Sequence, residues 1–157
     1  MPLNFSMLIV EGNQELRDRL SRHFLSLGYD VMALHHPRQA LSVATFKHFN
    51  VALIDDSLPE MDGLALMQRL KRLILGLRVI VMPTRDSREF ATEALARGAY
   101  DCVLKSCRLS EIARVVEEAV EVQALVETVR ENSVALAEDT VISSSPIRDH
   151  ELETIED

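Results

Sequence analysis

The chain has 157 residues, 47% hydrophobic and 27% charged, which is typical of one soluble globular domain with some chain to spare. No apolar run approaches the ~20 residues needed to cross a bilayer, and the first residues lack the features of a secretion signal, so we expect a cytoplasmic protein without a membrane partner. The net charge is −8, but residues 137–157 carry −6 of it, and the nearly neutral remainder has no basic stripe. We therefore expect no direct binding to nucleic acid.

Short apolar runs alternate with stretches of helical periodicity along the whole chain. The apolar runs predict buried strands at 5–10, 31–34, 50–55, 78–82 and 101–104. Helical patterns follow these strands at 13–28, 38–49, 63–75, 87–98 and from Leu109 onward. In the first helix, Asn13 is the expected N-cap and Gly28 the expected stop. Five strand–helix repeats with short connections predict an α/β fold, a five-stranded parallel sheet with helices on both faces.

Ionisable residues follow three of these strands. Functional groups of parallel sheets collect outside the carboxyl ends of the strands. There the sequence places Glu11-Gly12, Asp55-Asp56, Pro83-Thr84 and, after the fifth strand, Lys105.

An acid, an acid pair and a lysine on one edge are suited to phosphoryl chemistry. Carboxylates attract Mg²⁺, which binds oxygen ligands while keeping several waters. A lysine supplies a point charge for phosphate oxygens, and an aspartate can act as a nucleophile toward phosphorus. A simple ion pair between Asp55 and Lys105 explains the same residues equally well, so chemistry alone leaves both interpretations open.

The order and spacing of these residues resemble the receiver domain of two-component response regulators. Asp55 lies four residues before Pro59, and "MDG" follows, as in the family run "D-x-x-(L/M)-P-x-M-D-G". The stretch "GAYDCVLKS", from Gly98 to Ser106, is similar to the family's "G-A-x-D-Y-L-x-K-P". "GNQELRDRL" and the "GY" before the second strand also match, and the resemblance covers about three quarters of the chain.

The resemblance implies a doubly wound (βα)5 flavodoxin-like fold and a role for each site residue. Asp55 is then the phosphoacceptor, and Lys105 is the lysine that contacts the phosphoryl group. Mg²⁺ would be held by Glu11, by Asp55 and by the backbone carbonyl of Ser57. Asp56 falls at a position that is usually aliphatic or small, so we expect it to be a solvated loop acid.

Four positions depart from the family pattern. Receivers usually have two acids after the first strand, where this chain has Glu11-Gly12, and losing one carboxylate should weaken Mg²⁺ binding. The usual Ser or Thr after the fourth strand aligns with Pro83, so Thr84 would supply the hydroxyl only through a one-residue slip. A switch aromatic and a proline are replaced by Cys102 and Ser106.

Two functional hypotheses follow. In the first, the chain accepts a phosphoryl group on Asp55 from a sensor histidine kinase or phosphotransfer protein, with no enzymatic activity beyond self-catalysed phosphotransfer and dephosphorylation. In the second, it is an atypical receiver that acts as a dimerisation or interaction module without phosphorylation. A haloacid dehalogenase-type phosphatase would need an acid in place of Ser57, and a Rossmann nucleotide-binding domain would need a glycine-rich first turn.

The last helix continues beyond the expected end of a receiver. Its apolar residues recur with alternating spacings of three and four, the pattern of a coiled-coil seam, which predicts a homodimer. The seam residues are Ile112, Val115, Ala119, Val122, Val126, Val129 and Leu136, with Ser133 as the polar exception. We therefore divide the chain into a receiver domain (1–120), a helical coiled-coil linker (121–139) and an acidic, disordered tail or linker (140–157). Such a linker suggests fusion to an output domain in a longer protein.

Overall fold

The computed structural model describes the backbone of residues 5–156 and the side chains of residues 5–137. Strands and helices alternate strictly along the chain. The strands are β1 (Ser6–Val10), β2 (Asp30–Leu34), β3 (Val51–Asp55), β4 (Arg78–Met82) and β5 (Asp101–Cys102). The helices are α1 (Gln14–Ser26), α2 (Pro37–Ala44), α3 (Gly63–Leu73), α4 (Arg88–Ala96) and α5 (Leu109–Glu156).

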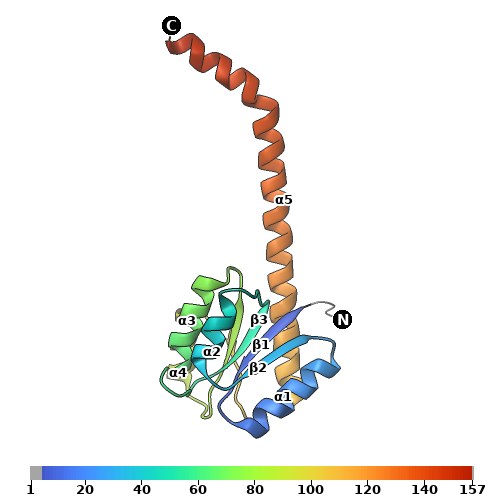
Figure 1. Ribbon diagram of the computed structural model, residues 1–157, viewed down its shortest axis with the longest axis vertical. Helices are drawn as coiled ribbons and strands as arrows, with labels where there is room; N and C mark the ends of the chain where they lie inside the picture. Colours follow the sequence, from blue (N-terminus) through green and yellow to red (C-terminus); the bar gives the residue numbers. More distant parts are fainter. Residues whose placement is uncertain (1–4, 157) are drawn as a thin grey trace. The chain divides into compact units, whose positions relative to one another are not determined.

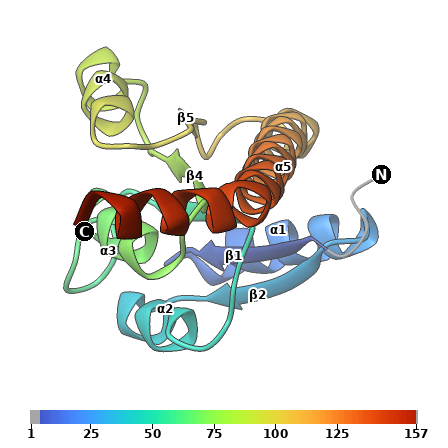
Figure 2. The ribbon, with the colours of Figure 1, turned by 90° about the horizontal axis from the view of Figure 1, so that it is seen from above.

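The five strands form one parallel sheet in the order β2-β1-β3-β4-β5. Figure 1 shows β2, β1 and β3 side by side in that order. Helices α1 and α5 cover one face of the sheet, and α2, α3 and α4 cover the other (Figure 2). The central strands are apolar on both faces because both faces are covered, and each residue of β3 is buried. The predicted doubly wound five-stranded fold is confirmed.

Local sequence signals explain where most helices begin. The Asn13 side chain accepts a hydrogen bond from the Leu16 N–H (2.8 Å), which confirms the predicted N-cap of α1. Gly28, which follows α1, has φ +98°, a left-handed conformation that favours glycine. The Asp62 side chain caps α3 through the Ala65 N–H (2.8 Å), and Ser87 caps α4.

Two elements are shorter than the sequence pattern predicts. Helix α2 ends at Ala44 because Thr45 closes the last turn, donating its hydroxyl to the Ser42 carbonyl (2.7 Å), and because Phe49 turns into the core. Strand β5 comprises two residues, although the Val103 N–H still donates to the Val81 carbonyl (3.0 Å).

The chain divides into two compact units, residues 1–123 and 124–157. In the first unit, α5 packs its apolar stripe into the core through Ile112, Val116 and Ala119. Helix α5 is assigned as far as Glu156, past the start of the segment 140–157 that the sequence predicts to be a tail. That segment lies outside the residues whose side chains are described, and the proposed boundaries at 120 and 139 stay a prediction. No helix in the described part of the chain is long and apolar enough to span a membrane.

Candidate functional site

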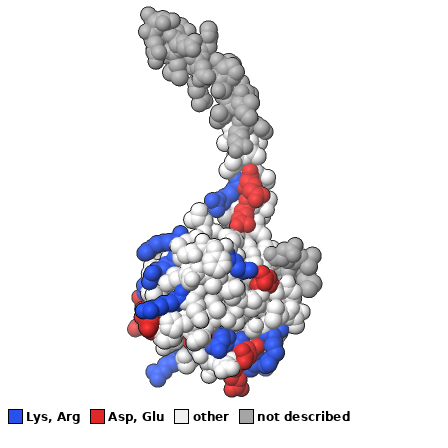
Figure 3. All heavy atoms as spheres, viewed as in Figure 1, with Lys and Arg blue, Asp and Glu red and all other residues white. Residues whose placement is uncertain are grey.

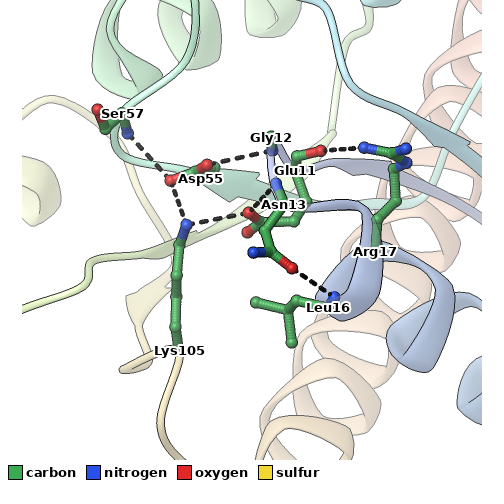
Figure 4. Close-up of polar contacts among 8 residues, drawn as sticks. All are labelled: Glu11, Gly12, Asn13, Leu16, Arg17, Asp55, Ser57 and Lys105. Carbon is green, nitrogen blue, oxygen red and sulfur yellow. Dashed lines mark hydrogen bonds and ion pairs between the residues drawn. The ribbon is translucent and has the colours of Figure 1, made fainter.

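Strand pairing brings the predicted site residues together at one edge of the sheet. Val10 pairs with Ile54, so the residues that follow, Glu11 and Asp55, lie side by side at the ends of β1 and β3. Lys105 reaches the same point from the loop after β5. Its ammonium lies 2.7 Å from Asp55 Oδ1 and 3.0 Å from Glu11 Oε2, bridging the two carboxylates (Figure 4).

Asp55 is almost completely buried, with 2% of its surface exposed. Its Oδ1 also accepts a hydrogen bond from the Ser57 N–H (3.1 Å), and its Oδ2 accepts one from the Gly12 N–H (3.2 Å). Burial by itself would raise the pKa of Asp55, but the hydrogen bonds from Lys105, Ser57 and Gly12 outweigh it and leave the pKa below its ordinary value. The carboxylate is therefore ionised at neutral pH and surrounded by donors.

Glu11 is fully buried and only partly satisfied. Its Oε2 accepts hydrogen bonds from the Asn13 N–H (2.9 Å) and from Lys105. Its Oε1 is buried and has no hydrogen-bond partner in the part of the chain that the structure describes. Burial is the main cause that raises the pKa of Glu11, and the hydrogen bonds from Asn13 and Lys105 oppose it. A buried carboxylate oxygen without a donor is suited to a cation.

Lys105 stays charged despite its position. Burial would lower the pKa of its ammonium group, but the hydrogen bonds to Asp55 and Glu11 raise it above the ordinary value. A cation fixed between two carboxylates is positioned to meet the oxygens of an incoming anion.

The "MDG" run has a structural role beside the acceptor. A Cβ atom on Gly63 would collide with the backbone carbonyl oxygen of Asp55, so glycine lets α3 begin directly against the end of β3. The Gly63 N–H donates to the Asp56 carbonyl (3.0 Å), and Ser57 and Asp62 form a β-bridge across the loop. The sequence motif is therefore partly a steric requirement of the loop that holds Asp55.

Asp56 is not the solvated loop acid that the sequence suggests. It is half-buried, and its Oδ1 has no hydrogen-bond partner among the described residues. Burial, followed by hydrogen bonding and charge interaction with Asp55, raises the pKa of the Asp56 carboxyl group. The physical reason is that residue 56 lies inside the tight β3–α3 connection, with its backbone N–H turned toward the Met82 carbonyl (3.4 Å).

Thr84 stays apart from this cluster. Its side chain is exposed, and no hydrogen bond or ion pair found among the described residues joins it to Asp55 or Lys105. Pro83 is buried in the position where the family places a hydroxyl, and its carbonyl oxygen accepts a hydrogen bond from the Lys105 N–H (3.1 Å). The loops after β4 and β5 are therefore linked through backbone atoms.

The residues present fit a magnesium ion with few protein ligands. Glu11 offers its unpartnered Oε1 and Asp55 offers a carboxylate, and the Ser57 carbonyl stays a predicted ligand. Mg²⁺ commonly binds through one or two carboxylates and keeps its remaining waters. No group of three His, Cys, Asp or Glu side chains among the described residues is arranged to hold a metal.

Sequence reasoning missed two backbone donors, the amides of Gly12 and Ser57. The "GN" after Glu11 signals a turn before α1, but a one-letter sequence does not show that this turn points an N–H group at Asp55. Ser57 was predicted only as a carbonyl ligand, whereas its amide is the group seen to contact the acceptor.

Comparison with known proteins agrees with this geometry. Residues 7–117 match the model of the response regulator receiver domain family. The chain is 31% identical over 131 residues to the regulatory protein AtoC of Escherichia coli K12, covering 83% of this chain and 28% of AtoC. It is 27% identical to the transcriptional regulatory protein ZraR of Escherichia coli O157:H7, covering 97% of this chain and 34% of ZraR. The chain therefore spans about a third or less of the length of these two relatives.

Solved structures show the same fold. A CheY-like receiver domain from Methanospirillum hungatei superimposes with a TM-score of 0.73 at 24% identity, covering 77% of this chain and 97% of that one. A response regulator from Burkholderia pseudomallei, solved with a phosphorylated aspartic acid, a calcium ion and citrate, gives a TM-score of 0.68 at 28% identity, with 82% and 75% covered. The matched family model, the 31% identity to AtoC and the shared fold together show that this chain belongs to the response regulator receiver family and forms the receiver domain of a two-component response regulator.

Proposed function

We propose that Asp55 accepts a phosphoryl group from the phosphohistidine of a sensor histidine kinase or a phosphotransfer protein. The observation that carries this proposal is the environment of Asp55, a buried carboxylate that Lys105 and two backbone amides keep ionised. An ionised carboxylate is the nucleophilic form, and the donors around it compensate for negative charge brought by the phosphoryl group. The phosphorylation-independent alternative is not needed to account for these residues.

The transfer requires one bond to form and one to break. A carboxylate oxygen of Asp55 forms a bond to phosphorus, while the bond from phosphorus to the histidine nitrogen breaks and its electron pair stays on the imidazole. The Lys105 ammonium then contacts a phosphoryl oxygen and keeps its ion pair with Glu11. Hydrolysis of the acyl phosphate later restores Asp55.

A bound Mg²⁺ would neutralise charge on the transferring group, with Glu11, Asp55 and the Ser57 carbonyl as its protein ligands. Support comes from the unpartnered Glu11 Oε1 and from the related Burkholderia protein, whose structure contains a calcium ion and a phosphorylated aspartic acid. We propose that Gly12 makes this site weaker than one with a second acid.

Restoring the second acid tests the metal site. A Cβ atom on Gly12 would lie 3.5 Å from Asp55 Oδ2, an ordinary contact, so a side chain is tolerated there. We expect Gly12→Asp to tighten Mg²⁺ binding about tenfold or more, because it adds a carboxylate beside a site with few charged ligands. Calorimetric titration with Mg²⁺ measures this change. Gly12→Asn is the matched control of similar size, and equal affinity of the two variants would contradict the proposed ligand set.

Beryllofluoride provides the test of the acceptor. It mimics a phosphoryl group on an aspartate, so the native chain should bind it and show chemical-shift changes around Asp55 and Lys105. Asp55→Asn should abolish these changes. Native protein that shows no response at saturating Mg²⁺ and beryllofluoride would refute phosphoacceptance at this site.

We further propose that Thr84 supplies the hydroxyl that closes on the phosphoryl group. It follows Pro83 directly, and the hydrogen bond from Lys105 to Pro83 already ties this loop to the site. In a longer protein, the receiver would pass its signal to an output domain through a homodimer formed by α5. The names of AtoC and ZraR, a regulatory and a transcriptional regulatory protein, support control of transcription as that output.

A further inference from the structure

Large apolar side chains on the surface of the first unit gather at one edge. In residues 5–123, each exposed large hydrophobic residue lies at or just beyond the C-terminal end of a helix. These residues are Leu25 in the last turn of α1 and Leu27 after it, Phe46 after α2, Leu73 at the end of α3 and Leu75 after it, and Leu95 in the last turn of α4. Because each helix leads back to the start of the next strand, these ends lie at the sheet edge opposite Asp55.

Four of these residues belong to the face covered by α2, α3 and α4. Phe46 is 76% exposed, Leu75 is 70% exposed, and Leu95 and Leu73 are about half exposed. Helices α2 and α3 pack against each other and run in the same direction, so their C-terminal ends are neighbours. Scattered apolar residues on a surface need no explanation, but a group at one edge indicates a contact surface.

Three cations lie at the same ends of α3 and α4 as these apolar residues. Arg72 is exposed on α3, and Arg97 at the end of α4 contacts Gln68 (2.7 Å) and Glu93 (3.2 Å). Lys71 donates to the Gly98 carbonyl (2.6 Å). Figure 3 shows Lys and Arg side chains gathered over the side of the molecule where Figure 1 places α3.

A fourth cation lies near Lys71. Burial, and then the charge of Arg78 at the start of β4, lower the pKa of Lys71, so these two cations lie close to each other. The acid of this group, Glu93, is already paired with Arg97. We call this surface, formed by Phe46, Leu73, Leu75 and Leu95 with Lys71, Arg72 and Arg97, the basic–apolar edge.

We propose that the basic–apolar edge is a docking surface for an acidic, amphipathic helix of a partner protein. Apolar residues flanked by cations complement a helix with one apolar and one acidic face. A second copy of the same edge would bring like charges together. Membrane-binding segments carry clusters of about four to eight cations, whereas of the four cations named here Arg72 alone is exposed and the others are half-buried. Since Asp55 lies at the opposite edge, a docked helix would leave the acceptor accessible.

The test uses the full chain and a designed probe. The probe is a fluorescent amphipathic peptide of about 16 residues, enough for a helix of several turns, with leucines on one face and glutamates on the other. A second peptide has lysines in place of the glutamates, and phosphatidylglycerol vesicles represent a membrane. Fluorescence anisotropy measures binding to the peptides, and flotation measures binding to the vesicles.

Matched variants locate the binding surface. Arg72→Glu and Leu75→Ser should each weaken binding of the acidic peptide about fivefold, the effect of losing one exposed contact of ordinary strength. Arg19→Glu reverses an exposed charge on α1, and Leu25→Ser removes a leucine that is 53% exposed at the end of α1. Both controls lie on the other face of the sheet and should stay within about twofold of the native chain.

The outcomes separate the possibilities. Preference for the acidic peptide, lost in the variants at the edge and kept in the controls, supports the proposal. The proposal would be overturned by equal binding of the acidic and basic peptides, or by equal effects of the edge and control variants. Binding to vesicles in place of the acidic peptide would also overturn it. Absence of peptide binding would overturn it as well.

Discussion

At the scale of single residues, burial raises the pKa values of the carboxyl groups in the site, and a small set of hydrogen-bond donors lowers them. The Asp55 carboxylate accepts hydrogen bonds from Lys105 and from two backbone amides, and these donors lower its pKa despite burial. Glu11 and Asp56 each keep an oxygen without a partner among the described residues, and burial raises both of their pKa values. The ionised form of Asp55 is therefore stabilised, whereas burial disfavours the ionised forms of Glu11 and Asp56.

Asp56 provides a prediction for stability. Its folded-state pKa lies above its unfolded value, so the folded state binds the proton more tightly and loses stability as pH rises above about 4. Asp56→Asn removes this loss. In EDTA, the variant should be more stable than the native chain at pH 7, and the difference should shrink toward pH 4. Urea unfolding at both pH values measures it, and a difference that grows toward pH 4 would contradict the assignment.

At the scale of elements, strand pairing brings the site residues together, and capping and turn residues shape the loops around them. Asn13 was predicted from its position before a helical stripe, since an N-cap is a local signal. Gly63 was recognised only as part of a motif, because its close approach to the Asp55 carbonyl involves two elements that meet only in the fold. The burial of Asp56 was missed for the same reason. The sequence alone was enough to predict that Glu11, Asp55 and Lys105 lie at one edge of the sheet, because parallel strands have their carboxyl ends at the same edge.

Gly63→Ala tests the close packing of α3 against β3. The new methyl group would collide with backbone atoms of Asp55 and Asp56, which cannot rotate away as a side chain can. We expect a loss of about 1–3 kcal/mol in the free energy of unfolding, the usual range for overpacking. Gly12→Ala, on the other side of Asp55, meets only Oδ2 at 3.5 Å and should cost much less. Similar losses from the two substitutions would refute the steric explanation.

At the scale of the whole molecule, the apolar stripe of α5 continues beyond the part that is buried in the first unit. Ile112, Val115 and Ala119 are core residues. Further along the same stripe, Val126 is 40% exposed and Val129 is 56% exposed. A seam that continues with exposed apolar residues is suited to a second helix, which is the basis for the proposed homodimer.

Val129→Asp tests the homodimer. It places a charge on the predicted seam and should shift the native chain from dimer to monomer, because a charge buried between two helices lacks a partner. Thr128→Asp introduces the same charge on the neighbouring exposed position, off the seam, and should leave the dimer intact. Sedimentation velocity distinguishes the two results, and a native chain that sediments as a monomer would contradict the proposal directly.

The central claim is that Asp55 takes the phosphoryl group. The most direct measurement is intact mass spectrometry after incubation with Mg²⁺ and a small-molecule phosphodonor, followed by fragmentation to locate the modified residue. We predict one added phosphoryl group on the native chain and on Asp56→Asn, located at Asp55, and none on Asp55→Asn. A native chain without added mass under conditions that label another receiver domain, or a label that persists in Asp55→Asn, would contradict the account.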